Sequence, residues 1–299
     1  METEPQKHSL TDKCKLKNSW IKQGLAEFLG TFMLILFGCG SLAQSILSRG
    51  VSGNVLTASI GFSFGLTIAV YATIGVSGAH LNPAISLSMC VLGRLQWLKL
   101  PVYCVAQFIG AFVGSAAVFG LYYDAFMAFD GGNLAITGQN ATAQIFSSYP
   151  APHLSFANGF ADQIIGAAAL LFSILAILDS KNDGVPKGLE PVVIGLIIMV
   201  IGFSMSFNCG GPVNPARDFG PRLFTAMAGW GFGVFRAGDG WWWVPVIAPM
   251  IGGVIGTLVY VLIIELHHNE AVPKERSCTS EQQMEAKAKY EMISVQCNK

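Results

Sequence analysis

Six long apolar stretches constrain this chain more than any other feature of its sequence. They cover residues 25–45, 55–75, 99–121, 159–178, 190–207 and 244–265. About 20 apolar residues in a helix cross the hydrocarbon core of a bilayer. In lipid only helices and closed barrels satisfy every backbone polar group. The sequence therefore predicts an all-α membrane protein with six transmembrane helices.

Charge is scarce between the two ends of the chain. Charged residues make up 12% of the sequence, and half of them lie outside residues 24–266. The formal net charge is zero, so no basic surface is available for nucleic acid. We expect an N-terminal tail over 1–22, a membrane domain over 23–268 and a C-terminal tail over 269–299.

Basic residues beside the predicted spans indicate the orientation, because Lys and Arg favour the cytoplasmic side. Those assigned to the inner side are Lys13, Lys15, Lys17, Lys22, Arg94, Lys99, Lys181 and Lys187. Residues 124–158 then form an extracellular loop, in which Asn140 begins an N-glycosylation sequon. The sequence predicts a multi-pass protein with both termini in the cytoplasm.

The chain also contains an internal repeat. The triplet Asn82-Pro83-Ala84 recurs 132 residues later as Asn214-Pro215-Ala216. Further matches pair Glu27 with Gln163, Gly110 with Gly252 and Gly114 with Gly256. Each half, about 23–123 and 159–268, holds three spans. Since three is odd, the halves insert in opposite senses, which is an inverted repeat typical of transport proteins.

Each triplet precedes an apolar segment that is too short to cross a bilayer. The segments run from Asn82 to about Gly93 and from Asn214 to about Met227. Twelve or so helical residues reach only about 18 Å. Entering from opposite sides, two re-entrant half-helices would meet by their N-termini near the midplane. Irregular backbone at that depth requires a water-filled cavity or protein around it.

The two asparagines suit the constriction of such a cavity. An N-cap Asn accepts a bond from its own helix through its side-chain oxygen, and Pro is favoured at the next position. The amide NH₂ groups of Asn82 and Asn214 then remain as donors to a water or hydroxyl between them. Each half-helix also contributes about half a positive charge there. Such a site disfavours protons and cations and admits neutral solutes.

Arg217 lies one turn along the second half-helix, and an arginine inside a span is a functional candidate. We expect a fixed donor at the outer constriction. The alternatives are a salt bridge with Asp218 or an interfacial position.

Enzyme chemistry has no support in the sequence. The seven cysteines form no CxxC pair, and the five histidines show no metal-binding pattern. No nucleophile with histidine and acidic partners can be assembled from the spacing. We expect no enzyme activity, metal or cofactor.

The segments Ser77 to Ala84 (SGAHLNPA) and Asn214 to Arg222 (NPARDFGPR) resemble the aquaporin, or major intrinsic protein, family. The likeness covers about residues 20–268 and points to the aquaglyceroporin branch, in the animal group of aquaporins three, nine and ten. It implies passive conduction of water, glycerol and other small neutral solutes by a homotetramer in the plasma membrane. A water-selective aquaporin and a secondary transporter remain alternatives.

The resemblance also implies roles for individual residues. It places a selectivity ring on Phe62, Gly202, Gly211 and Arg217, and it makes Asp218 the marker of the glycerol-conducting branch. Gly202 would leave room for a carbon chain. Gly211 would widen the ring enough to pass urea.

Both loops that precede the asparagines receive roles from the same resemblance. Pore-lining carbonyls are expected on Gly78, Ala79, His80, Asn208, Cys209 and Gly210. Glu27 and Gln163 are expected to pin the two loops by hydrogen bonds. His80 has two alternatives, a structural hydrogen bond or acid-sensitive gating, because histidine titrates near pH 6.5.

Overall fold

The computed structural model describes residues 15–182 and 184–268. The chain divides into two units, residues 1–265 and 266–299. The expected C-terminal tail, 269–299, and residues 1–14 of the expected N-terminal tail lie outside the described residues. The all-α prediction is confirmed, because the described part of the chain contains helices and no strand.

Eight helices form the two halves of the repeat. Those of the first half are α2 (Ser19–Leu47), α3 (Val55–Ser77), α4 (Pro83–Val91) and α5 (Leu100–Leu121). Those of the second half are α7 (Phe156–Leu178), α8 (Glu190–Met205), α9 (Pro215–Ala228) and α11 (Val244–Ile263). Shorter helical segments are η1 (Trp97–Lys99), α6 (Tyr123–Ala128), η2 (Phe129–Gly132), η3 (Ala143–Ile145), η4 (Phe232–Phe235), α10 (Ala237–Gly240), η5 (Trp241–Trp243) and η6 (Glu265–His267).

The predicted spans correspond to α2, α3, α5, α7, α8 and α11. Among the described residues, five helical segments are long and apolar enough to cross a membrane. Of the six predicted spans, α8 is the one that falls short of this length: it has 16 residues and ends before the predicted stretch 190–207 does. The short segments after the two triplets are helical as predicted, with 9 residues in α4 and 14 in α9.

Local sequence explains where several helices begin and end. Asn18 and Asn54 cap α2 and α3 by accepting backbone N–H bonds with their side chains. Ser155 does the same for α7. At the other end of α3, Gly78 adopts φ +86°, a left-handed conformation that stops the helix.

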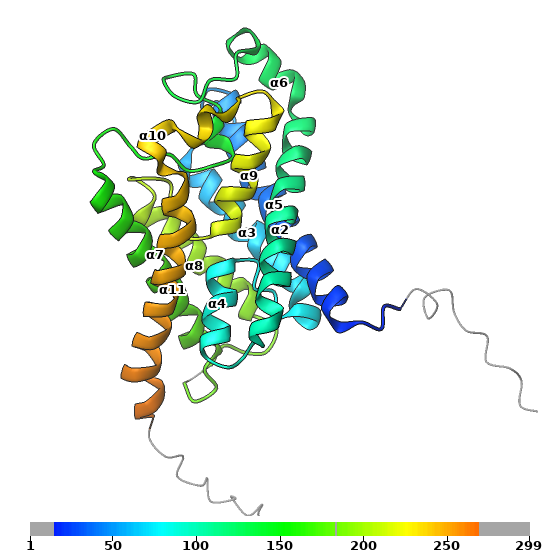
Figure 1. Cartoon of the computed structure of the whole chain (residues 1–299), viewed down its shortest axis with the longest axis vertical. Coiled ribbons are helices and arrows are strands. Elements are labelled where there is room, and N and C mark those ends of the chain that lie inside the picture. The colour runs from blue at the N-terminus through cyan, green and yellow to red at the C-terminus, as the bar shows by residue number, and fades with distance from the viewer. Residues whose placement is uncertain (1–14, 183, 269–299) are drawn as a thin grey trace, which may run out of the picture. The chain divides into compact units, whose positions relative to one another are not determined.

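Packing follows the repeat. In the first half α2 contacts α5, and in the second half α7 contacts α11 in the equivalent way. Across the halves, α3 packs on α8, α4 on α11, and α9 on α5. The two short helices α4 and α9 therefore lie one below the other between α11 and α5 (Figure 1). Each half-helix is held by the last long helix of the opposite half.

Two matched glycines permit close helix crossings. A Cβ atom on Gly110 of α5 would lie 2.3 Å from the carbonyl oxygen of Phe28 in α2. A Cβ atom on Gly252 of α11 would lie 2.3 Å from the carbonyl oxygen of Ile164 in α7. Both distances are too short for any side chain, so these positions require glycine. The repeated glycines of the sequence thus fix equivalent backbone contacts in the two halves.

Candidate functional site

The two half-helices begin with equivalent asparagine caps. The Oδ1 atom of Asn82 accepts a bond of 2.8 Å from the Ala84 N–H. The Oδ1 atom of Asn214 accepts bonds of 3.0 Å from Ala216 N–H and 3.2 Å from Arg217 N–H. Proline follows each asparagine at the first helical position. Both side-chain oxygens are thereby committed to the half-helices.

The amide nitrogens of the same side chains join the two halves. Asn82 Nδ2 donates to the Val213 carbonyl at 3.0 Å, and Asn214 Nδ2 donates to the Leu81 carbonyl at 2.9 Å. An NH₂ group carries two hydrogens. One hydrogen on each amide holds the opposite loop, and the second remains available to a solute. This crosswise bonding orients the two donors.

A central cavity of about 1080 Å³ runs past both asparagines. All the expected constriction, ring and loop residues line it, namely Phe62, Gly78, Ala79, His80, Asn82, Gly202, Asn208, Cys209, Gly210, Gly211, Asn214 and Arg217. Glu27, Asp218 and Gln163 do not, because they lie behind the lining. The fold therefore gathers the solute-facing candidates from both halves around one space.

The loops before the asparagines hold unusual backbone conformations. The non-glycine residues Ala79, Leu81 and Val213 have φ values of +52°, +53° and +37°. Such conformations cost on the order of 1–3 kcal/mol each and persist only where the surroundings fix them. Here the carbonyls of Leu81 and Val213 accept the asparagine bonds described above.

Glu27 is a completely buried residue of α2 that receives four donors. Its Oε1 atom accepts from Ser77 Oγ at 2.5 Å and from His80 N–H at 3.0 Å. Its Oε2 atom accepts from Leu81 N–H at 2.6 Å and from Gln107 Nε2 at 2.7 Å. Three of the four donors belong to the segment that leads into Asn82, so one carboxylate fixes the first loop.

The second loop is held differently from the first. Gln163 donates from Nε2 to Cys209 Sγ at 2.9 Å, while its Oε1 is buried without a hydrogen-bond partner. The neighbouring Asp162 binds the loop more extensively. It accepts from Asn208 Nδ2 at 2.7 Å and from the Cys209 thiol at 3.3 Å. Sequence reasoning missed Asp162, although an acidic residue inside an apolar span is a visible signal.

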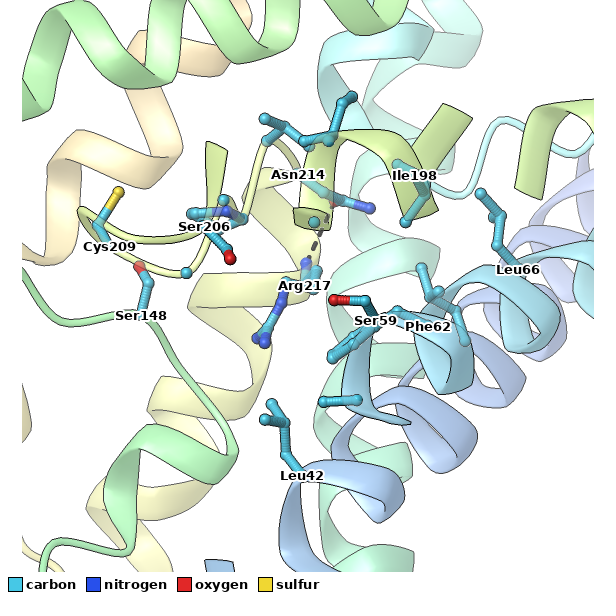
Figure 2. Close-up of a pocket in the computed structure, with 18 of the residues that line it drawn as sticks. Leu42, Ser59, Phe62, Leu66, Ser148, Ile198, Ser206, Cys209, Asn214 and Arg217 are labelled. Carbon is cyan, nitrogen blue, oxygen red and sulfur yellow. Dashed lines mark hydrogen bonds between the residues drawn. The ribbon is translucent and has the colours of Figure 1, made fainter. Parts of the chain in front are cut away.

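Arg217 and Phe62 form one side of the cavity (Figure 2). The guanidinium carbon of Arg217 lies 4.7 Å from the centre of the Phe62 ring, a cation–π contact. Its Nη1 donates to the Phe146 carbonyl at 2.6 Å. The alternative of a salt bridge between Arg217 and Asp218 is wrong, because Asp218 pairs with Arg222 instead. Arg217 is left as a donor on the cavity wall.

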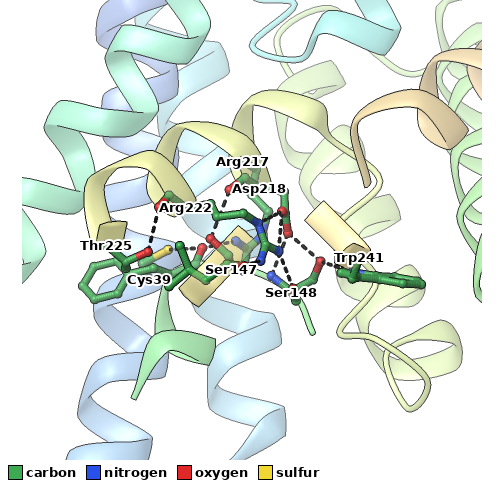
Figure 3. Close-up of polar contacts among 10 residues, drawn as sticks. Cys39, Ser147, Ser148, Arg217, Asp218, Arg222, Thr225 and Trp241 are labelled. Carbon is green, nitrogen blue, oxygen red and sulfur yellow. Dashed lines mark hydrogen bonds and ion pairs between the residues drawn. The ribbon is translucent and has the colours of Figure 1, made fainter. Parts of the chain in front are cut away.

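The pair of Asp218 and Arg222 is fully buried and ties the loop of residues 124–158 to α9 (Figure 3). Arg222 Nη2 lies 2.8 Å from Asp218 Oδ1, and Arg222 Nη1 donates to the Val234 carbonyl at 2.9 Å. The other carboxylate oxygen accepts from Ser148 N–H at 2.6 Å. Asp218 therefore positions the loop of residues 124–158 rather than the guanidinium of Arg217.

The space next to Gly202 is not empty. A Cβ atom on Gly202 would lie 2.8 Å from Ser59 Oγ and 3.1 Å from Ser59 Cβ. Ser59, on α3, thus fills the room that was expected to remain open. A Cβ atom on Gly211 would meet nothing closer than 3.5 Å. Ser59 also lines the cavity and was missed, although it lies one helical turn before Phe62.

His80 combines a polar contact with aromatic packing. Its Nδ1 lies 3.1 Å from Ser86 Oγ, and its ring centre lies 5.0 Å from that of Tyr103. Both contacts suit the structural alternative of the two considered.

We expect His80→Ala to leave the pH response of solute flux unchanged, because the ring is held by packing. The measurement is glycerol flux at a cytoplasmic pH of about 5.5 and of about 7.4, on either side of the ordinary pKa of histidine. Loss of a wild-type pH response in His80→Ala would instead support gating.

Asn140 bonds to Asp130 and Arg49. Its Nδ2 donates to Asp130 Oδ1 at 2.7 Å, and its Oδ1 accepts from Arg49 at 3.3 Å. Thr142 of the same sequon is buried and accepts from Trp230 Nε1 at 3.0 Å. Use of the sequon remains a prediction. No metal-binding group of three or more His, Cys, Asp or Glu occurs within residues 15–182 and 184–268.

Comparisons with known proteins agree with the geometry. Residues 14–260 match the family model "Major intrinsic protein". The chain is 55% identical to human Aquaporin-9, covering 95% of each chain. It is 50% identical to human Aquaporin-10, covering 93% of this chain and 94% of the relative. The X-ray structure of the aquaglyceroporin from Plasmodium falciparum superposes with a TM-score of 0.74 at 31% identity, covering 82% of this chain and 97% of that one.

Proposed function

The chain belongs to the major intrinsic protein family, and on this basis we propose that it is a passive channel for water, glycerol, urea and other small neutral solutes. The family is one of channels and not of enzymes. The likeness to Aquaporin-9 and to an aquaglyceroporin supports the glycerol-conducting branch. No cofactor or energy source enters this mechanism.

One observation carries the proposal: Asn82 and Asn214 present amide donors to a single cavity between two opposed half-helices. A solute oxygen between them accepts from both. Its hydrogens then point away in both directions, which interrupts a proton-conducting chain of water. The positive ends of α4 and α9 meet at the same place and repel cations. Neutral hydroxyl solutes satisfy the donors without such a penalty.

The outer part of the cavity fits a molecule with a polar edge and an apolar edge. Arg217 supplies donors, and the Phe62 ring beside it supplies an apolar surface. Glycerol carries hydroxyls along one side of a carbon chain, so it can meet both surfaces together. Gly211 adds no side chain opposite them, which favours passage of urea as well.

Swelling of proteoliposomes tests this function directly. In a glycerol gradient we expect rapid re-swelling after the initial shrinkage, because glycerol enters with water. In a sucrose gradient we expect shrinkage alone. Fast water flux without glycerol entry would favour the water-selective alternative. Saturable uptake that depends on an ion gradient would favour the secondary transporter.

We further propose a homotetramer in the plasma membrane, with each protomer forming its own channel and both termini in the cytoplasm. Exposed apolar side chains on α2, α3, α5 and α11 support burial of these helices in lipid or against neighbouring copies. The basic residues at the predicted inner ends of the spans support the orientation. Enzymatic deglycosylation followed by a gel-mobility comparison of wild type and Asn140→Gln tests the use of the sequon.

A further inference from the structure

Ser59 is a polar cavity-lining residue to which the family resemblance gave no role. Ser59 lies on α3, one turn before Phe62, and its side chain lines the central cavity. It is 8% exposed, and its hydroxyl points into the cavity (Figure 2). Ser59 is therefore placed to contact a permeating molecule.

The hydroxyl of Ser59 is committed as a donor and free as an acceptor. Its Oγ donates to the Val55 carbonyl, four residues earlier, at 3.0 Å. A hydroxyl has one hydrogen and two lone pairs. Because the hydrogen is used within α3, the lone pairs remain for a donor inside the cavity.

This acceptor complements Arg217. A guanidinium group offers donors only, so a solute hydroxyl that accepts from Arg217 still needs an acceptor for its own hydrogen. The Phe62 ring next to Arg217 is apolar and provides no such acceptor. Without an acceptor for this hydrogen, a polyol hydroxyl would lose a hydrogen bond to water on entering the constriction, and no bond to the protein would replace it.

We propose that Ser59 is a specificity-determining residue, whose Oγ accepts a hydrogen bond from a polyol hydroxyl at the outer constriction. Gly202 is required for this role, because any Cβ there would lie 2.8 Å from Ser59 Oγ and would displace it. The glycine on α8 and the serine on α3 thus act as a pair. The inference rests on the proposed glycerol conduction and deepens it.

The test compares glycerol and water permeability in proteoliposomes containing wild type, Ser59→Ala and Ser115→Ala. Ser115 is the matched control. It makes the same type of bond, to the Ala111 carbonyl at 2.9 Å, but is fully buried and does not line the cavity. We expect Ser59→Ala to lower glycerol permeability about five-fold, the factor that one neutral hydrogen bond supports. Water permeability should stay within about two-fold, and Ser115→Ala should change neither.

A second variant moves the hydroxyl to the opposite helix. In Ser59→Gly/Gly202→Ser, the side chain enters the same space from α8, and we expect glycerol permeability to recover at least in part. A steric role predicts the reverse, since Ser59→Ala removes an atom and would raise glycerol flux. Unchanged or increased glycerol flux in Ser59→Ala overturns the inference. Absence of glycerol flux in wild type would instead overturn the proposed function.

Discussion

Asp218→Ala is expected to lower the thermal midpoint of the solubilised protein by about 10 °C and to abolish most glycerol flux. Arg222 is fully buried, and this substitution would leave its charge without the carboxylate at 2.8 Å. Removing one member of a buried ion pair costs on the order of 3–5 kcal/mol. Ser148 N–H would lose its acceptor as well. The outer loop that also bonds Arg217 through Phe146 would then lose its fixed position.

Arg94→Ala is the matched control for this experiment. Arg94 pairs with Glu265 at 3.4 Å, but both side chains are substantially exposed. Exposed pairs contribute about 0–1 kcal/mol, so the thermal midpoint should hardly move. If Asp218→Ala melted no lower than Arg94→Ala, the buried pair would not be the support of the outer loop. Asp218→Asn should fall between the two, because it keeps an acceptor and loses the charge.

Glu27→Gln is expected to reduce both water and glycerol flux by at least about ten-fold, although the two side chains have the same shape. Each carboxylate oxygen of Glu27 accepts two hydrogen bonds. In either orientation of a glutamine amide, its NH₂ group would face two donors. Leaving buried donors unpaired costs about 1–3 kcal/mol each. The first loop, which carries Leu81 in a left-handed conformation, would lose its main support.

Gln163→Met at the equivalent site of α7 serves as the control. Gln163 reaches the loop only through a cysteine sulfur and also donates to Asp162 Oδ1 at 3.1 Å. Asp162 keeps its own bonds to Asn208 and Cys209 of the same loop when that donor is removed. The second loop also presents one donor fewer, because Pro212 stands where the first loop has His80 and proline has no N–H. We expect flux to fall less than two-fold, given the weakness of such a bond. Equal losses in Glu27→Gln and Gln163→Met would contradict the assigned difference between the loops.

The sequence allowed the family, the all-α fold and the half-helices to be predicted correctly. Apolar segments long enough to cross a bilayer, and the two shorter apolar segments after Asn-Pro-Ala, are local patterns of the sequence. In lipid such segments must be helical, because a helix satisfies its own backbone hydrogen bonds. The repeated glycines Gly110 and Gly252 were likewise visible, and the structure shows them at equivalent helix crossings. The extent of α8 was less well predicted, since apolar composition continues past the last helical turn at Met205.

Partners of the buried polar groups depended on the tertiary structure. By spacing alone, Asp218 was a candidate partner of its neighbour Arg217, whereas the structure pairs it with Arg222. By the same reasoning Gln163 was expected to hold the second loop, but Asp162 makes most of the contacts to that loop. The role proposed for Ser59 likewise depends on α8, which brings Gly202 against it.

The sequence by itself determined which segments enter the membrane, because length and hydrophobicity are properties of a single segment. Only the tertiary structure decided which side chains share a hydrogen bond or a space across α3, α8 and α9. Those pairings depend on helix rotation and crossing distance, and a shift of one residue along a helix turns a side chain by about 100°. The pattern of apolar residues restricts the rotation of each helix, but packing against the other half of the repeat fixes it.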